Sequence, residues 1–152
     1  KLRVGYSDRA ELMEIIDRTT SGHKPDVKRV LDAKKIIAYQ QVVKQVPISN
    51  EVQDYAVRLV LATHPDEELA TPNVKSFLRF GASPRAAQTL VLAGKVKALL
   101  AGRTEVQPED IRDVVLCALR HRCILNFEAE AEGVTCDDIL TNLIDTLPIT
   151  TM

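Results

Sequence analysis

The sequence predicts an all-α protein, a helical bundle of about six helices with at most one small strand pairing. Three observations lead to this prediction. Apolar residues recur every three or four positions over segments too long for strands, side-chain caps and prolines precede these segments, and turn residues separate them at short intervals. With 152 residues, of which 45% are apolar and 27% charged, the composition fits one ordinary globular domain.

The first two predicted helices lie on either side of a polar break. A helix capped by Ser7 ends near Thr20, and residues 21–25 interrupt the chain. Asp32 caps a second helix that extends to about Gln45. The first helix is predicted to bury one apolar stripe, made of Leu12, Ile15, Ile16 and Thr19.

A third helix and a long polar loop follow. Pro47 ends the second helix, and Ser49 caps the third, whose apolar positions follow the helical period as far as Thr63. Residues 64–81 are rich in turn formers and are predicted to form a long loop that carries one helical turn. The acidic run at 66–68 within this loop is either a partner-binding segment or a solvated one.

The fourth predicted helix, from Pro84 to Ala101, is the most apolar segment of the chain. Ser83 supplies a side-chain cap, and a proline fits the first turn because its missing N–H would have no partner there. Apolar residues occur nearly all round this helix, which is therefore predicted to be the central and most buried one. Gly102 suits the position just past its end.

Two more helices complete the predicted bundle. Residues 107–119 start with a proline and acids and keep one apolar face, which indicates a fifth helix. An extended segment at 124–127 and an acidic turn up to Gly133 come next. A sixth helix begins with a capping box at 135–138 and ends before Pro148.

The sequence lacks the motifs of several enzyme classes. It has no phosphate-binding loop of the form Gly-x4-Gly-Lys, no glycine pair of a dinucleotide fingerprint and no His-Glu-x-x-His helix. Ser83 resembles a nucleophile elbow only superficially, because Arg85 stands where the closing glycine belongs. Cys117, His121 and Cys123 are conceivable metal ligands, but burial of the cysteines is the favoured interpretation since no fourth ligand is apparent.

Charge, cysteine content and hydropathy limit the partners and the cellular environment that the sequence allows. Twenty basic and 21 acidic residues give a net charge of −1, which provides no field for a polyanion, so nucleic acid is disfavoured as a partner. Three cysteines do not suggest a disulfide framework and indicate a reducing, cytoplasmic environment. The longest apolar run, Val114 to Leu119, is too short for a membrane span, and no signal peptide is apparent. A start at Lys1 without Met indicates a piece of a longer protein.

Arg85 is the strongest candidate for a functional side chain. It lies in the first turn of the fourth predicted helix, where unpaired N–H groups and the helix dipole favour an anion. A cation at this end is unfavourable for the helix itself, but a guanidinium can bind phosphate oxygens through two parallel hydrogen bonds. From the residues alone, a phosphate-facing role and a surface ion pair are equally open.

Several motifs, in order along the chain, resemble the carboxy-terminal lid of MoxR-type AAA+ ATPases. They are Gly-Ala-Ser-Pro-Arg-Ala at 81–86, Gly-Arg at 102–103, Val-x-Pro-Glu-Asp at 106–110, Leu-Arg-His-Arg at 119–122 and Phe-Glu-Ala-Glu-Ala-Glu-Gly at 127–133. Segments 1–6 and 47–63 also resemble the family, so the resemblance covers nearly the whole chain. Each motif is weak by itself, but their order and spacing together are specific.

The resemblance implies a division of the chain and roles for three residues. Residues 1–5 would be the end of the ATPase core and the hinge, and residues 6–152 the helical lid. Arg85 would be the sensor 2 arginine, which binds the γ-phosphate of ATP held by the core, while Tyr6 and Ile15 would lie near the adenine. Ile15 is equally well placed for core packing. The P-loop and the Mg-binding residues would lie upstream, so this chain alone would not hydrolyse ATP.

The same resemblance implies a function and partners. The parent protein would be a chaperone-like ATPase that couples nucleotide state to the remodelling of client proteins. Its lid would contact the ATPase core of the same polypeptide and neighbouring subunits of a ring, typically a hexamer, and it would work with von Willebrand factor A domain proteins. His121 and Arg122 would contact a neighbouring subunit or pack with a surface ion pair. The alternative is a stand-alone helical adaptor that binds a protein and no nucleotide.

Overall fold

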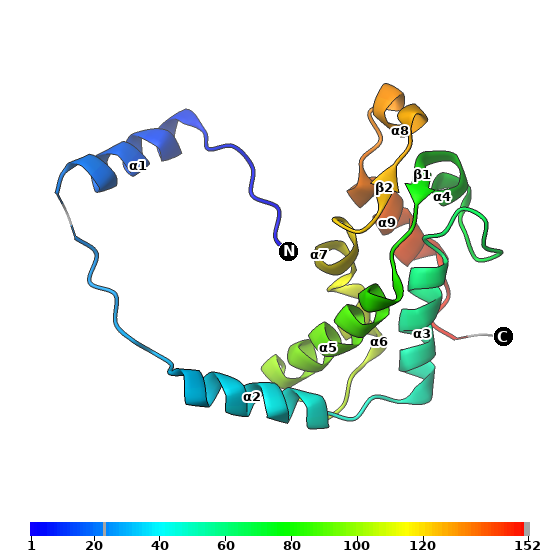
Figure 1. Ribbon diagram of the computed structural model, residues 1–152, viewed down its shortest axis with the longest axis horizontal. Helices are drawn as coiled ribbons and strands as arrows, with labels where there is room; N and C mark the ends of the chain where they lie inside the picture. Colours follow the sequence, from blue (N-terminus) through cyan, green and yellow to red (C-terminus); the bar gives the residue numbers. More distant parts are fainter. Residues whose placement is uncertain (23, 151–152) are drawn as a thin grey trace.

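The computed structural model describes residues 1–22 and 24–150; residue 23, inside the predicted polar break, and residues 151 and 152 lie outside the described part. The described residues form nine α-helices and one two-stranded antiparallel sheet, which confirms the predicted all-α class with a small strand pairing. Figure 1 shows that the helices from α2 onward form a packed body, whereas α1 stands apart from it. No helix of the described residues has both the length and the apolar content that a bilayer crossing requires.

The first helix, α1 (Arg9–Thr20), begins with a capping box. The Asp8 carboxylate accepts a hydrogen bond from the Glu11 N–H at 2.8 Å, and the Glu11 carboxylate accepts one from the Asp8 N–H at 3.0 Å. The predicted cap at Ser7 is therefore wrong by one residue, because it is Asp8 that has an acid three positions later.

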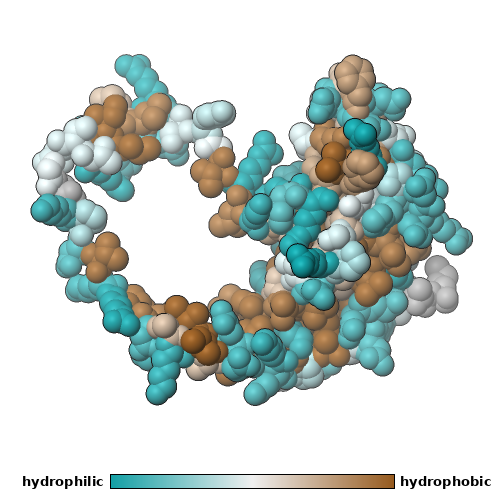
Figure 2. Space-filling model, viewed as in Figure 1, coloured by the Kyte–Doolittle hydropathy of each residue, from teal (hydrophilic) through white to brown (hydrophobic). Residues whose placement is uncertain are grey.

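The predicted burial of the α1 stripe is also wrong. No residue of α1 is buried, and Ile15 is 47% exposed. The physical reason is the position of α1: an extended segment carries it away from the body, and Figure 2 shows open space between the two. The amphipathic pattern therefore predicted the helix correctly, but it could not predict burial, because burial requires a second surface against which the apolar stripe can pack.

The next two helices begin at their predicted caps. The side chain of Asp32 caps α2 (Ala33–Gln45), accepting from the Lys35 N–H at 2.7 Å, and Ser49 caps α3 (Asn50–Leu61). Although α2 packs against the body, none of its residues is buried. By contrast, α3 contributes six buried residues, namely Val52, Tyr55, Ala56, Arg58, Leu59 and Val60.

The predicted long loop contains a short helix and a strand. Thr71 caps α4 (Pro72–Phe77), which corresponds to the predicted helical turn, and the strand β1 (Leu78–Phe80) follows directly. β1 pairs antiparallel with β2 (Ile124–Leu125), with a register shift between its two pairs. The strand pairing joins two segments that are more than forty positions apart in the chain.

The predicted acidic turn before Gly133 is instead a helix, α8 (Phe127–Glu132). The Asn126 side chain caps it by accepting from the Ala129 N–H at 3.0 Å, and Gly133 ends it with φ of 71°. A helix of six residues is too short to show a clear apolar period, so the signals in the sequence for this helix are the cap at Asn126 and the glycine at 133.

The longest helix, α5 (Pro84–Leu100), packs against α2, α3, α6 and α7. Its buried residues repeat every four positions: Ala86, Leu90, Gly94 and Ala98. Its contacts with four helices agree with the predicted central position, but the prediction that it is the most buried helix is wrong. Only four of its seventeen residues are buried, against six of twelve in α3, and Leu92 and Leu100 are 47% and 81% exposed. Ser83 occupies the N-cap position but makes no side-chain cap hydrogen bond, so that predicted cap bond is also absent from the structure. Gly102 just after the helix has φ of 70°, as its predicted role requires.

The predicted fifth helix is divided into α6 (Pro108–Arg112) and α7 (Val115–Leu119). At the junction the Val114 N–H bonds to the carbonyl of Ile111, three residues back, so the α-helical ladder is interrupted. The division lets α6 pack on α3 and α5 while α7 packs on α9 (Cys136–Thr146). The Thr135 and Asp138 capping box of α9 is confirmed.

Replacement of Gly81 by alanine is expected to destabilise the body. A Cβ built at Gly81 would lie 2.6 Å from the carbonyl oxygen of Thr63, a backbone atom that cannot move aside. We expect the Gly81→Ala variant to lose roughly 1–3 kcal/mol of unfolding free energy, the usual cost of overpacking. Urea denaturation followed by circular dichroism measures this loss. Gly5→Ala is the matched control, because nothing lies within 4 Å of its added Cβ; equal loss in both variants would contradict the prediction.

Candidate functional site

The start of α5 is held against the end of α3 by two hydrogen bonds. The Thr63 hydroxyl accepts from the N–H of Ala82 at 2.9 Å and donates to the carbonyl of Val60 at 2.6 Å. The His64 Nε2 donates to the carbonyl oxygen of Ala82 at 2.9 Å. Thr63 and Ala82 have no exposed surface, so water does not compete for the bonds of the Thr63 hydroxyl, while the bond of His64 is partly buried. The backbone that enters α5 therefore has a fixed direction.

Arg85 is the second residue of α5, and its side chain is exposed. None of the ion pairs among the described residues includes Arg85, so the predicted alternative of a surface ion pair is not observed there. The helix behind it is seventeen residues long, and no side chain caps its first N–H groups. The positive end of the helix dipole and the guanidinium thus lie together at one exposed place, an arrangement suited to an anion.

A second arginine reaches the same face of α5. Arg122 Nη1 donates to the hydroxyl of Thr89 at 3.3 Å, and that hydroxyl donates to the carbonyl of Arg85 at 2.8 Å. Thr89 follows Arg85 by one helical turn, so the two lie on one face. Arg122 also donates to the Ala118 carbonyl and has no carboxylate partner among the described residues, unlike the predicted surface ion pair.

The turn after α5 is fixed by an ion pair within two of the quoted motifs. Arg103 binds the carboxylate of Asp110 through both terminal nitrogens, at 2.6 and 2.5 Å, and the Gln107 N–H donates to the same carboxylate at 2.9 Å. Asp110 is 2% exposed. The hydrogen bonds from Arg103 lower the pKa of Asp110, against the opposing effect of burial. This carboxylate is therefore a structural anchor of the corner between α5 and α6.

A similar fork joins α7 to α9. Arg120 donates to the two oxygens of Asp137 at 2.8 Å each, and Arg3 of the N-terminal segment lies 3.7 Å from the same carboxylate. Sequence reasoning did not find this pair, because seventeen positions separate the partners and no local pattern relates them.

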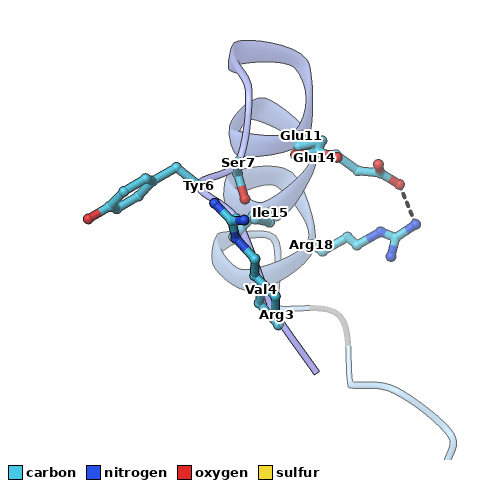
Figure 3. A pocket seen from close by; sticks show the side chains of 9 residues that line it. Arg3, Val4, Tyr6, Ser7, Glu11, Glu14, Ile15 and Arg18 are labelled. Carbon is cyan, nitrogen blue, oxygen red and sulfur yellow. Dashed lines mark hydrogen bonds and ion pairs between the residues drawn. The ribbon is translucent and has the colours of Figure 1, made fainter. Parts of the chain in front are cut away.

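Tyr6 and Ile15, the predicted adenine contacts, line one surface pocket of about 550 Å³ together with Arg3 and Arg18. Figure 3 shows the Tyr6 ring directed away from α1, in agreement with its complete exposure. Arg85 does not line this pocket. The structure thus brings two of the three predicted site residues together and leaves the third on the body, and their roles stay predictions.

The cysteines are free thiols, and Cys123 is buried, as the favoured interpretation of these residues predicts. Cys117 and Cys136 are half-buried. No group of three or more metal-binding side chains is found in the part of the chain that the structure describes.

Comparison with known proteins agrees with the motifs at these sites. Residues 71–143 match the family of AAA lid domains. The chain is 33% identical over 149 residues to Chaperone MoxR1 of Mycobacterium tuberculosis, an alignment that covers 98% of this chain and 39% of that protein. A crystal structure from Cytophaga hutchinsonii, described as an ATPase, superposes with a TM-score of 0.82 at 31% identity, over 97% of this chain and 45% of that one. The chain contains an AAA lid domain of the MoxR-like AAA+ family.

The lid domain is shorter than the proteins it resembles. A second relative, the uncharacterized protein YeaC of Bacillus subtilis, is 28% identical over 152 residues, which cover 98% of this chain and 44% of that protein. The chain therefore spans less than half the length of the curated relatives it matches. Within the chain, Arg85 and Arg122 lie inside the lid family match, whereas Tyr6 and Ile15 lie outside it.

The anchor at Asp110 is expected to make the stability of the lid domain depend on pH. The pKa of Asp110 is lower in the folded state than in the unfolded one. The stabilisation of the fold by the charged carboxylate is therefore fully present above about pH 4, the ordinary pKa of aspartate, and it is lost as the pH falls through the lower folded-state pKa. Near neutral pH, Asp110→Asn should cost roughly 1–3 kcal/mol, and the difference from the unmodified chain should shrink in acid.

Urea denaturation of both chains between pH 7 and acid conditions measures this difference. The exposed neighbour Glu109 supplies the control variant Glu109→Gln, which should show a small and nearly constant difference. A difference for Asp110→Asn that grows toward low pH would show that the carboxylate does not stabilise the fold in its charged form.

Proposed function

We propose that Arg85 is the sensor 2 arginine of this lid domain, and that in the whole protein it binds the terminal phosphate of ATP held by an ATPase core. The observation that carries the proposal is an exposed guanidinium without a protein partner in the described part, placed at the uncapped start of the longest helix. A phosphate fits this place because both the arginine and the helix terminus favour an anion. Arg122 adds a second positive group on the same face.

The mechanical consequence follows from the strength of one contact. A hydrogen bond between charged groups contributes about 1.5–3 kcal/mol, and this one would exist only while the terminal phosphate is present. Loss of that phosphate would release Arg85, and the orientation of the lid would then differ between the two nucleotide states. The bonds of Thr63 and His64 to Ala82 would transmit the pull on α5 to α3, because they join the two helices rigidly.

The partners of the whole protein are part of the same proposal. The lid would contact the ATPase core of its own polypeptide and neighbouring subunits of a ring, as in a hexamer, with Tyr6 and Ile15 near the adenine. The core would supply the groups that bind Mg and catalyse hydrolysis. Similarity to Chaperone MoxR1 supports a chaperone-like role. The proposal places this role in the cytoplasm, with von Willebrand factor A domain proteins among the partners.

A stand-alone protein adaptor is the second candidate, and one observation favours it. An apolar groove of about 520 Å³ lies between α2 and α5, lined by residues such as Ile36, Tyr39 and Leu99. The two candidate functions predict different coding sequences upstream of this chain. A Gly-x4-Gly-Lys-Ser/Thr motif encoded upstream of Lys1 is expected for the ATPase lid, whereas an adaptor would have none.

The Arg85→Ala variant of the whole protein should hydrolyse ATP roughly 10- to 150-fold more slowly, which corresponds to the loss of one hydrogen bond between charged groups. The fold should persist, because an exposed cation at a helix start does not stabilise that helix. Steady-state ATPase assays measure the turnover, and thermal unfolding measures the stability.

The matched control is Lys75→Ala, which removes one exposed cation from α4, a helix of the same body. Its ATP turnover should stay near that of the unmodified protein. Unchanged turnover in the Arg85→Ala variant, or an equal decrease in both variants, would argue against the sensor role.

A further inference from the structure

The groove between α2 and α5, about 520 Å³ in volume, has an apolar floor. Its lining includes Ile36, Tyr39 and Val43 of α2 and Val96, Leu99 and Leu100 of α5. Gln40 and the hydroxyl of Tyr39 are the polar side-chain groups of this lining. Tyr39 is 56% exposed and Leu100 is 81% exposed, and Figure 2 shows apolar surface along α2. Exposed apolar surface of this kind is typical of a place where another molecule binds.

Lysines lie on both sides of this α2–α5 groove. The lining positions 36, 39, 40 and 43 share one face of α2. Successive helical residues are about 100° apart, so Lys35 and Lys44 fall on opposite sides of this face, and Lys34 falls on the far side of the helix. On α5, Lys95 directly precedes the lining residue Val96, and its Nζ donates to the carbonyl oxygen of Lys44 at 3.2 Å. This bond places a third ammonium group where α5 meets the end of α2.

No carboxylate compensates the charges of these three lysines. Residues 33–50, which include α2, and residues 69–104, which include α5, contain no Asp or Glu, although the chain has 21 acidic residues. None of the ion pairs among the described residues includes Lys35, Lys44 or Lys95. The groove therefore combines an apolar floor with a basic rim. A complementary partner has apolar side chains for the floor and carboxylates for the rim.

We propose that the α2–α5 groove binds an amphipathic helix of a partner protein, whose acidic side chains contact Lys35, Lys44 and Lys95. The floor extends over two turns of α2, about 11 Å, which matches apolar residues at i, i+3, i+4 and i+7 of a helix in a groove. Apolar burial would supply most of the affinity, and the charges would select an acidic partner. Arg85 does not line the groove, so this inference is independent of its proposed sensor role.

An anionic lipid surface is the other partner that combines apolar groups with negative charge. A bilayer accepts side chains that project from a protein, whereas this floor is recessed between two helices. The chain has a net charge of −1 and therefore no overall attraction to an anionic membrane. A helix with its side chains is a cylinder about 10 Å wide, which suits a groove between two helices. The shape and the overall charge thus favour a protein helix.

The test measures, by fluorescence anisotropy, how a fluorescein-labelled peptide with the sequence of residues 8–20 binds to the full 152-residue chain. This peptide has the required pattern, because apolar residues at 12, 15 and 16 are accompanied by Glu11, Glu14 and Asp17. We expect saturable binding that weakens at high salt. The matched control peptide carries Glu11→Gln, Glu14→Gln and Asp17→Asn and keeps the apolar stripe. It should bind roughly tenfold more weakly, because it cannot form exposed ion pairs with the rim.

Variants of the chain show whether the peptide occupies the groove. Lys35→Glu combined with Lys44→Glu should weaken binding of the acidic peptide roughly tenfold, whereas Lys34→Glu, on the far side of α2, should change it less than about twofold. All three lysines are exposed, so the fold should persist, which circular dichroism checks. The double variant should instead prefer a peptide whose three acids are replaced by lysine. A folding defect would not produce this exchange of preference.

Four outcomes would overturn the proposal. Two of them are the absence of peptide binding at millimolar concentration and an equal loss of affinity in the Lys34→Glu and double variants. Sedimentation of the chain with phosphatidylserine vesicles, abolished by the double variant, would identify a membrane as the occupant of the groove. Self-association of the chain that the same variant abolishes would identify a second copy of the chain.

Discussion

The attachment of α5 to the end of α3 is the constraint on which the rest of the structure depends. Gly81 approaches the backbone of Thr63 so closely that no side chain fits, and the next residue, Ala82, forms a buried hydrogen bond to Thr63 and a partly buried one to His64. Together these contacts fix where α5 begins and in which direction it runs. The buried stripe of α5 then positions α3, α6 and α7 around it, and the exposed start of the helix presents Arg85 outward.

Hydrogen-bonded arginine side chains hold segments that apolar packing alone does not fix. The short helices α6 and α7 are too short to be stable alone, and each is held by an arginine that forks onto an aspartate: Arg103 onto Asp110, and Arg120 onto Asp137. In the same way, Arg58 of α3 binds the carbonyls of Pro148 and Ile149 and so fixes the chain after α9. The arginines of the body that have carboxylate partners therefore hold the fold together, whereas Arg85 and Arg122 have no carboxylate partner among the described residues.

The N-terminal region follows a different rule from the body. Its helix α1 has an amphipathic sequence and a complete capping box, yet every apolar side chain on it is exposed. Figure 2 shows apolar surface on α1 and along α2, next to the open space that separates α1 from the body. Under the proposed function, these are surfaces that an ATPase core or a neighbouring subunit would cover, because exposed apolar stripes of this size favour association.

The sequence by itself determined the helical class, the helix starts at Asp32, Ser49 and Thr135, and the order of the lid motifs, because caps and apolar periods are local signals that depend on the next few residues. The tertiary structure alone decided which stripes are buried, where the predicted fifth helix divides, and that the acidic turn is a helix. It alone also brought Arg122 to α5. These outcomes depend on contacts between distant segments, and no periodicity within a segment encodes which surface it will meet.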